Sequence, residues 1–227
     1  MSLLYLKNVS KDYNDSFVLE NVTFEMEPGE FISLVGRSGV GKTTLFKILI
    51  KEEKSTKGRV FFNDKDIAKL KPKELTYLRR KIGMIFQDFK LLVNRTAFEN
   101  VAFAMEVAGY SYESIKKDVP EFLKLVGLEN RLNHFPYQLS AGEKQRVVIA
   151  RVLAQRPELI LADEPTGNLD PINTWEIIKL LLKINEFGTA IILATHDKEV
   201  VNTLGKRVIS LEGGKIIRDE KEGKYLI

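Results

Sequence analysis

Short apolar runs separated by turn-forming residues open the chain and predict antiparallel strands. Runs of this kind occupy residues 3–7 and 18–26, and the second ends at the turn formed by Pro28 and Gly29. Alternation of short apolar segments with turn residues is typical of hairpins. We therefore expect a small antiparallel sheet in the first part of the chain.

The apolar pattern then changes to short, almost continuous hydrophobic runs. They occupy residues 31–35, 159–162 and 190–194. Continuous runs of this length are typical of parallel strands that are buried on both faces of a sheet. They predict the core of an α/β domain, with helices between the strands.

Helical spacing marks the middle of the chain. Phe98, Val101, Ala102 and Met105 fall at positions i, i+3, i+4 and i+7, which is one face of a helix. Residues 88–156 are therefore interpreted as an inserted helical lobe, and Phe98, Val101 and Met105 as part of its core.

Two further elements are predicted near the end. Asp170 followed by Pro171 resembles an N-cap and a first helical position, and this helix is expected to run to Gly188. Residues 207–211 and 215–217 lie on either side of Gly213 and Gly214, which predicts a terminal hairpin.

Length and composition favour one domain. The chain has 227 residues, of which 44% are hydrophobic and 29% charged, an ordinary composition for a globular protein. We expect a single domain over 1–227, with 1–87 and 157–227 forming the core and 88–156 the helical lobe.

A glycine-rich loop follows the first continuous apolar run and precedes an apolar helix start. Its residues are Gly36, Arg37, Ser38, Gly39, Val40, Gly41, Lys42, Thr43 and Thr44. This is the phosphate-binding pattern in its required setting between strand and helix, where backbone N–H groups and the helix N-terminus attract phosphate. Lys42 is expected to reach the β- and γ-phosphates and Thr43 to bind Mg²⁺. A glycine-rich turn is the alternative, and the flanking elements argue against it.

Polar residues follow two of the other predicted core strands. Asp163 and Glu164 come directly after one strand, and His196 follows the next. The carboxyl ends of parallel strands meet at one edge, so these side chains should share a crevice with the glycine-rich loop. Asp163 suits the Mg²⁺ shell, Glu164 a base that acts on water, and His196 a contact to the γ-phosphate. A capped turn and a surface histidine are the simpler alternatives.

Residues 139–146 read Leu-Ser-Ala-Gly-Glu-Lys-Gln-Arg, and an apolar helical run follows them. Ser140 and Gly142 at a helix N-terminus could form a second anion site. This segment resembles the signature of the ATP-binding cassette (ABC) family of P-loop ATPases. The resemblance covers nearly the whole chain. It implies a RecA-like core with an antiparallel β lobe and the inserted helical lobe, and Mg²⁺-dependent ATP hydrolysis in a homodimer with two composite sites.

The resemblance also assigns roles to residues outside these motifs. Tyr13 matches the aromatic residue that stacks on adenine. Gln87 matches the glutamine that links Mg²⁺ and the attacking water to a membrane partner. Residues 168–170, Asn-Leu-Asp, match the loop that crosses between subunits.

Two residues depart from the signature of the family. Ala141 replaces a glycine, and Glu143 replaces the usual glutamine. A methyl group near phosphate and an added negative charge favour slow hydrolysis, whereas Glu164 and His196 argue against an inactive site.

Residues 78–102 resemble the cell-division branch of the family, which implies an integral membrane subunit and a peripheral location on the cytoplasmic side of the membrane. Phe89, Leu91 and Leu92 lie in a polar loop and could form the docking groove for that subunit. Transporters for lipoprotein release or macrolide export are an alternative, as is a nucleotide-dependent scaffold of the division apparatus with little turnover.

Charge and cysteine content bear on the remaining classes of function. The net charge of +4 is small and is not gathered into a basic run, which gives weak support to an anionic membrane surface and little to nucleic-acid binding. The chain has no cysteine, so disulfides and thiolate metal sites are excluded. We find no signal peptide and no apolar run of about 18 residues, and we expect a cytoplasmic chain.

Overall fold

Two β-sheets organise the protein in the computed structural model, which describes residues 2–14 and 16–225. The smaller sheet is antiparallel, with strand order β2-β1-β4-β5. Its strands are β1 Leu4–Tyr13, β2 Ser16–Met26, β4 Lys57–Phe62 and β5 Lys65–Asp66. Leu4 pairs with Met26 on one side and with Phe62 on the other, so the predicted antiparallel sheet is confirmed.

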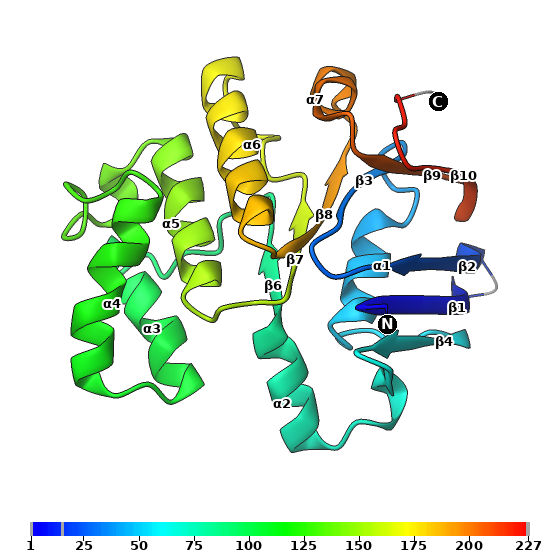
Figure 1. Cartoon of the computed structure of the whole chain (residues 1–227), viewed down its shortest axis with the longest axis horizontal. Helices are drawn as coiled ribbons and strands as arrows, with labels where there is room; N and C mark the ends of the chain where they lie inside the picture. The colour runs from blue at the N-terminus through cyan, green and yellow to red at the C-terminus, as the bar shows by residue number, and fades with distance from the viewer. Residues whose placement is uncertain (1, 15, 226–227) are drawn as a thin grey trace.

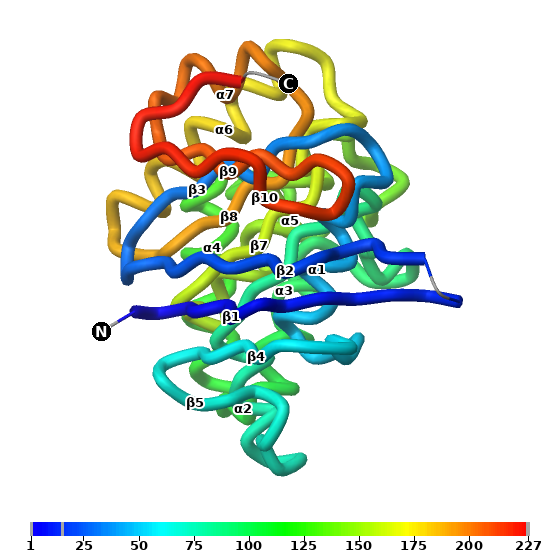
Figure 2. Tube along the Cα trace, turned by 90° about the vertical axis from the view of Figure 1, so that its right-hand side faces the viewer, coloured from blue at the N-terminus to red at the C-terminus, as the bar shows by residue number. Residues whose placement is uncertain are grey.

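The larger sheet has the strand order β10-β9-β3-β8-β7-β6. Its strands are β3 Phe31–Val35, β6 Ile82–Ile85, β7 Leu159–Asp163, β8 Ala190–Thr195, β9 Arg207–Glu212 and β10 Lys215–Glu220. All neighbours are parallel except β9 and β10, which form the predicted terminal hairpin. Figure 2 shows β2, β1 and β4 running side by side below β9 and β10.

Helices surround the larger sheet, and three of them gather at one end of the molecule (Figure 1). The α-helices are α1 Lys42–Leu49, α2 Pro72–Lys81, α3 Ala97–Ala108, α4 Tyr112–Leu125, α5 Ala141–Leu153, α6 Pro171–Glu186 and α7 Lys198–Leu204, and the 3₁₀ turns are η1 Ile67–Lys69 and η2 Pro136–Gln138. Helices α3, α4 and α5 pack on one another within the predicted lobe at 88–156. The lobe boundaries stay a prediction, and residues 1, 15 and 226–227 of the predicted domain lie outside the described residues.

The larger sheet carries a separate hydrophobic core on each face. Along β8, Ile191 and Leu193 pack with the helical residues, whereas Ile192 and Ala194 pack with α1 and the antiparallel sheet. This arrangement explains the continuous apolar runs, because both faces of each strand are buried. Val101 and Met105 of α3 are buried in the first core, as predicted.

Local sequence sets the helix that follows β7. Asp170 accepts hydrogen bonds from the backbone N–H groups of Ile172 and Asn173, both at 3.0 Å, and Pro171 occupies the first helical position. The predicted N-cap is therefore confirmed. The helix ends at Glu186, two residues before Gly188.

Candidate functional site

The ends of three parallel strands define the candidate site. Val35 of β3 pairs with Thr195 of β8, and Asp163 of β7 pairs with Ala194. The residues that follow these strands therefore emerge at the same edge of the sheet, as expected from the sequence. They are the glycine-rich loop, the carboxylate pair and the histidine.

The glycine-rich loop connects β3 to α1 and is fixed by close backbone contacts. A Cβ atom on Gly36 would lie 2.6 Å from the carbonyl oxygen of Leu211, and one on Gly41 would lie 2.7 Å from that of Val18. Gly41 also has φ of 110°, a conformation that favours glycine. Two glycines are therefore required by packing alone. Arg37, Ser38, Gly39 and Thr43 are exposed, and Val40 and Thr44 are half-buried.

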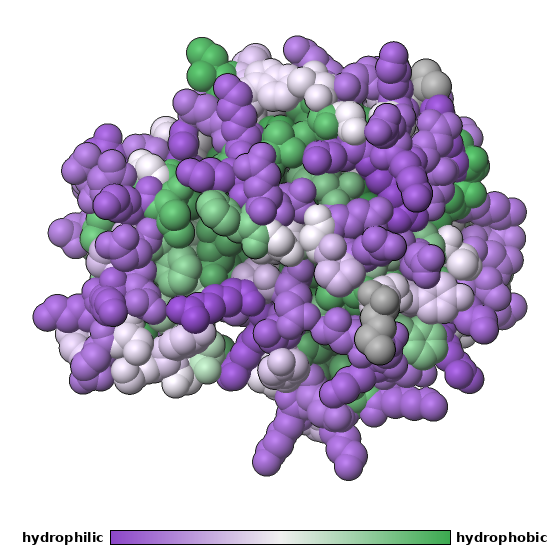
Figure 3. Space-filling model, in the orientation of Figure 1, coloured by the Kyte–Doolittle hydropathy of each residue, from purple (hydrophilic) through white to green (hydrophobic). Residues whose placement is uncertain are grey.

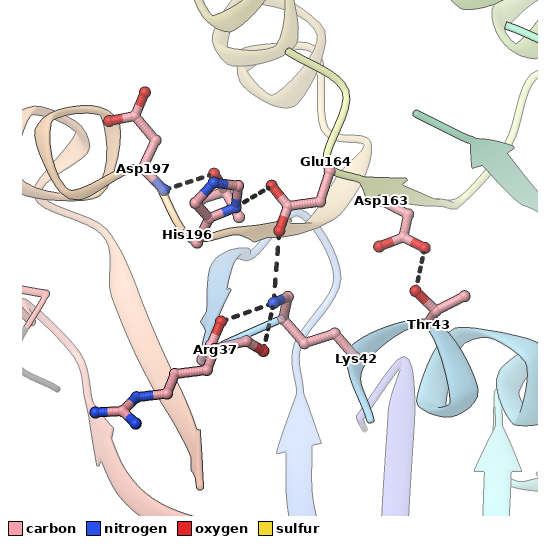
Figure 4. Close-up of polar contacts among 9 residues, drawn as sticks. Arg37, Lys42, Thr43, Asp163, Glu164, His196 and Asp197 are labelled. Atoms are coloured by element: carbon pink, nitrogen blue, oxygen red, sulfur yellow. Dashed lines mark hydrogen bonds and ion pairs between the residues drawn. The ribbon is translucent and has the colours of Figure 1, made fainter. Parts of the chain in front are cut away.

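Lys42 lies at the centre of this loop and is buried, with 6% of its side chain exposed. Its Nζ donates hydrogen bonds to the carbonyl oxygens of Gly36 at 2.7 Å and Arg37 at 3.3 Å. The same ammonium group lies 3.5 Å from Oε1 of Glu164. Figure 4 shows these contacts converging on one nitrogen. A buried ammonium is costly unless it is paired in this way.

Thr43 and Asp163 form a second pair in the site. The Thr43 hydroxyl donates a hydrogen bond to Oδ2 of Asp163 at 2.7 Å, although 120 residues separate them in sequence. Burial raises the pKa of Asp163, while the Thr43 hydrogen bond and the charge of Lys42 act in the opposite direction. The pair presents a hydroxyl and a carboxylate oxygen side by side, which is a ligand chemistry suited to a hard cation.

Glu164 stands at the end of β7 in a left-handed backbone conformation with φ of 48°. Its backbone N–H donates to the carbonyl oxygen of Ala194 at 2.9 Å, which fixes the turn. Its Oε2 lies 2.9 Å from Nδ1 of His196. Since a carboxylate accepts, Nδ1 carries the proton in this pair. Glu164 thus contacts both a lysine and a histidine (Figure 4).

His196 is positioned by the turn between β8 and α7. The N–H of Asp197 donates to the Thr195 hydroxyl at 3.0 Å, and Asp197 caps α7 through the N–H groups of Glu199 and Val200. The backbone on both sides of the histidine is therefore held.

Gln87 lies beside the chain that follows Glu164. Its side-chain Nε2 would lie 3.0 Å from a Cβ atom placed on Gly167. Its backbone carbonyl oxygen accepts a hydrogen bond from the side chain of Asn168 at 3.2 Å. Gln87 therefore contacts the loop at residues 167–168. The side chains of Thr43 and Asp163 form their hydrogen bond with each other.

Tyr13 lies at the end of β1, and 42% of it is exposed. The ammonium group of Lys11 lies 4.5 Å from the centroid of its ring. The adjacent strand β2 passes the glycine-rich loop at Val18, so the antiparallel sheet borders the site.

Ser140 and Gly142 begin α5, on the other side of β6, β7 and β8 from α1 (Figure 1). The structure therefore does not bring them to Lys42 within one chain. The Ser140 hydroxyl accepts from the N–H of Glu143 at 3.2 Å, and the N–H of Ser140 donates to Oε2 of Glu143 at 2.9 Å. This reciprocal arrangement is a capping box, and it opens the helix at the predicted place.

Glu143 is compensated by a neighbouring arginine. Nε of Arg131 donates to Oε1 of Glu143 at 2.8 Å. This contact and the hydrogen bond from Ser140 lower the pKa of Glu143. The negative charge that Glu143 was expected to add near the nucleotide is thus partly offset, because its carboxylate contacts Arg131 and Ser140.

The loop after Gln87 differs from the sequence interpretation. Phe89 and Leu91 are half-buried and pack on the helical core, whereas Leu92 and Val93 are 37% and 66% exposed. The apolar groove proposed from the sequence stays a prediction, with Val93 as an exposed residue that the sequence reasoning omitted.

Two residues that sequence reasoning missed hold this loop in place. The fully buried side chain of Asn100 accepts from the N–H of Leu92 at 2.8 Å and donates to the carbonyl oxygens of Leu92, Arg95 and Thr96. Arg151 of α5 donates to the carbonyl oxygens of Lys90 at 2.8 Å and Phe89 at 3.3 Å. Burial lowers the pKa of Arg151. Such bonds to backbone carbonyls leave no pattern in the sequence.

Among the described residues, no helix is both long and apolar enough to cross a bilayer.

Comparisons with known proteins give a consistent result. The sequence profile of the ABC transporter family matches residues 19–167. The cell division ATP-binding protein FtsE of Bacillus subtilis is 51% identical over 224 residues, which are 98% of each chain. FtsE of Streptococcus pneumoniae D39 is 46% identical over 226 residues, 99% of this chain and 98% of that protein. Among solved structures, the dimeric, post-hydrolysis ATP-binding cassette MJ0796 with ADP and Pi has a TM-score of 0.87 at 40% identity, covering 98% of this chain and 100% of that one.

Proposed function

The chain belongs to the ABC transporter family of ATP-hydrolysing cassettes, and we propose that it drives a membrane complex of the bacterial cell-division type, with an FtsX-like integral membrane subunit. The names of the two FtsE relatives support the cell-division role. They do not favour the lipoprotein-release or macrolide-export alternatives, nor a scaffold with little turnover. The observation that carries the hydrolytic part of the proposal is the cluster of Lys42, Glu164 and His196 at one sheet edge.

The cluster supports direct hydrolysis of the γ-phosphate of ATP. Lys42 is expected to exchange a carbonyl contact for oxygens of the β- and γ-phosphates, where its charge offsets the charge that develops. Glu164 would accept a proton from water as the water oxygen attacks the γ-phosphorus and the bond to ADP breaks. His196 would hold the carboxylate through Nδ1 and leave Nε2 for the phosphate side.

The donor set also supports a Mg²⁺ ion. The Thr43 hydroxyl and the Asp163 carboxylate lie 2.7 Å apart, and Mg²⁺ in proteins is usually held by one or two carboxylates together with substrate phosphates and water. Gln87, whose side chain lies near Gly167, would be a further ligand. When bound, the ion would neutralise charge on the β- and γ-phosphate oxygens. Burial raises the pKa of Asp163, and a bound cation would favour the ionised form of this carboxylate.

The separation of Ser140 from Lys42 within one chain supports a homodimer. Ser140 and Gly142 begin a helix on the far side of the central strands, yet a helix N-terminus with small residues is suited to phosphate. A second copy placed head to tail would bring this element to the opposite glycine-rich loop. Each ATP would then lie between Lys42 of one protomer and Ser140 of the other.

The proposed contact with the membrane subunit is the loop at residues 88–96. Leu92 and Val93 expose apolar surface there, while Asn100 and Arg151 hold the loop backbone in one conformation. A rigid loop lowers the entropy that docking would cost. The proposal includes a peripheral location of the chain on the cytoplasmic side of the membrane, where it would dock on the integral membrane subunit.

The test of the hydrolytic site is Glu164→Gln. We expect ATP to convert this variant into a persistent dimer on gel filtration, with phosphate release at least about 100-fold slower, since the base is lost while binding is kept. Glu121→Gln on the exposed face of α4 is the matched control and should behave like the unchanged protein. An unchanged rate of phosphate release in Glu164→Gln would refute the assignment of the base.

The test of docking is capture of the membrane subunit from detergent-solubilised bacterial membranes. Leu92→Asp and Val93→Asp should both reduce the amount of integral membrane subunit captured, because each places a charge on the exposed apolar surface. Their ATP binding should remain intact. If both variants captured the same subunit in undiminished amount, the loop at residues 88–96 would not be the docking site.

A further inference from the structure

The positive charge of the protein is concentrated in one segment. Eleven of the 35 basic residues but only five of the 31 acidic residues lie at positions 51–81, so this segment carries +6 and the rest of the chain −2. The basic residues are not gathered into one run of the sequence, so the net charge of +4 by itself gave only weak support to an anionic membrane surface. The fold changes that interpretation.

The segment forms one end of the molecule. It comprises β4, β5, η1 and α2, which lie together at the bottom of Figure 2, and long hydrophilic side chains project from the same end in Figure 3. The antiparallel sheet ends here with β5 as its last strand. Arg80 connects this end to the helical lobe, because its side chain donates a hydrogen bond to the carbonyl oxygen of Val107 in α3 at 2.7 Å.

Four lysines of this end have free ammonium groups. Lys65, Lys69, Lys71 and Lys73 are exposed, and within the described part of the chain their side chains make no ion pair or hydrogen bond to a carboxylate. The other cations of α2 are used internally. Arg79 donates to the carbonyl oxygens of Ile50 and Lys51, and Lys81 pairs with Glu158 at 3.0 Å.

The acidic residues nearest these lysines are directed mainly at the backbone. Asp66 accepts from the N–H of Ala68 at 2.9 Å, and Glu74 accepts from the N–H of Lys71 at 2.9 Å. Asp64 is the third, in the turn between β4 and β5. Two of the three carboxylates are thus occupied by helix capping, whereas the four ammonium groups face solvent.

An apolar hollow lies beside two of these lysines. It has a volume of about 440 Å³ and is lined by Phe62, Leu70, Tyr77 and Leu78, with Lys65 and Lys73 among its other lining residues. Tyr77 is 61% exposed. Lysines around an exposed aromatic residue and an apolar hollow are the composition of a membrane interface, where ammonium groups meet phosphates and apolar side chains enter the acyl boundary.

We propose that the end formed by β4, β5 and α2 rests on an anionic lipid bilayer. The proposal rests on the membrane location of the proposed function and adds a second attachment that does not depend on the membrane subunit. The lysines would meet lipid phosphates, and Tyr77 and the hollow would bury apolar surface at the interface. A nucleic acid fits less well, because the cations that line the hollow, Lys65 and Lys73, are lysines and the hollow itself is apolar.

Vesicle binding tests the proposal directly. The purified chain is mixed with vesicles of phosphatidylglycerol and phosphatidylcholine in equal amounts, or of phosphatidylcholine alone, and the bound fraction is measured by sedimentation. Binding to the anionic vesicles is expected, with a steep loss as salt is added. The combined variant Lys65→Gln, Lys69→Gln and Lys73→Gln should lose affinity on the order of 100-fold, at about fivefold for each lysine.

The matched control removes three exposed lysines elsewhere. Lys116→Gln, Lys117→Gln and Lys124→Gln on α4 change the net charge by the same amount, and binding should stay within about threefold. Both variants should keep the ATP turnover of the unchanged protein, which separates this test from that of the hydrolytic site. Equal loss in both variants, or undiminished binding by the first, would overturn the proposal.

Two further measurements address the apolar contact and the competing ligand. Tyr77→Ser should weaken binding to the anionic vesicles about tenfold, and an unchanged affinity would overturn the entry of this side chain into the interface. A duplex DNA oligonucleotide that binds more tightly than the anionic vesicles at equal salt would assign the surface to nucleic acid and end the proposal.

Discussion

Gly142 lies directly against the side chain of Asn173, so closely that a Cβ atom on Gly142 would meet Oδ1 of Asn173 at 2.2 Å and its Cγ at 2.8 Å. Asn173 in turn donates to Asp170, the N-cap of α6. The start of α5 and the start of α6 are therefore packed through one glycine. The loop from Glu164 to Asp170 joins this contact to the proposed base.

The contact predicts a specific coupling between the two residues. Gly142→Ala should lower the free energy of unfolding by about 1–3 kcal/mol, because the added methyl group overpacks a filled position. Asn173→Ala should lower the free energy of unfolding by less than Gly142→Ala does. The double variant should be more stable than the sum of the two single effects, since the alanine at 173 removes the obstruction. Urea denaturation of all four proteins measures the coupling, and strictly additive costs would contradict it.

Glu143→Gln should change ATP turnover by less than about threefold, because Arg131 already compensates the carboxylate that this variant removes. Glutamine also keeps the capping box. Glu143→Ala should instead lose about 1 kcal/mol of unfolding free energy, because the cap is broken. Steady-state phosphate release and urea denaturation distinguish the two. A large rise of ATP turnover in Glu143→Gln would instead show that the negative charge of Glu143 slows hydrolysis.

The stability contributed by Glu143 should depend on pH in one direction. Its pKa is lowered from 4.5, so the folded state favours the ionised form. The contribution is therefore complete above the ordinary pKa and is lost as the pH falls through the lowered one. The stability difference between the unchanged protein and Glu143→Gln should shrink below about pH 4.5, and a difference that grew on acidification would have the wrong sign.

Asn100→Ala should release the loop at residues 88–96. The variant leaves the N–H of Leu92 and three carbonyl oxygens without their buried partner, which should cost about 2–4 kcal/mol of unfolding free energy. Hydrogen exchange at the Leu92 amide should accelerate more than the change in global stability explains. Asn130→Ala, at an exposed position, is the control. Equal protection of Leu92 in both variants would show that other contacts hold the loop.

His196→Ala should slow hydrolysis by about 100-fold while ATP affinity changes only a few-fold, because Glu164 loses the partner that orients it. Single-turnover measurements separate the chemical step from binding. A large loss of ATP affinity with an unchanged chemical step would place His196 in binding alone.

The parts of the fold set by local sequence could be predicted. The continuous apolar runs identified β3, β7 and β8, and the order of a strand, a glycine-rich loop and a helix placed Lys42 and Thr43. Asp170 and Pro171 marked the start of α6. Since parallel strands end at one edge, the meeting of Glu164 with His196 also followed, although the lengths of their contacts did not.

Contacts between distant segments could not be predicted in the same way. Asn100 and Arg151 bind backbone carbonyls, which every residue has, so nothing in the sequence indicates the partner. The half-burial of Phe89 and Leu91 depends on how the loop folds back on the helical core. The close approach of Asn173 to Gly142 likewise depends on the angle between two helices.

The left-handed backbone at Glu164 sets a condition on how this protein can be improved. A glutamate at φ of 48° is strained by on the order of 1 kcal/mol relative to glycine, which adopts that conformation freely. Glu164→Gly would relieve this strain, but it would also remove the carboxylate that pairs with the buried ammonium of Lys42. Selection for resistance to heat therefore meets two opposing effects at this position, and such a screen has to score phosphate release in the same round to keep the proposed base.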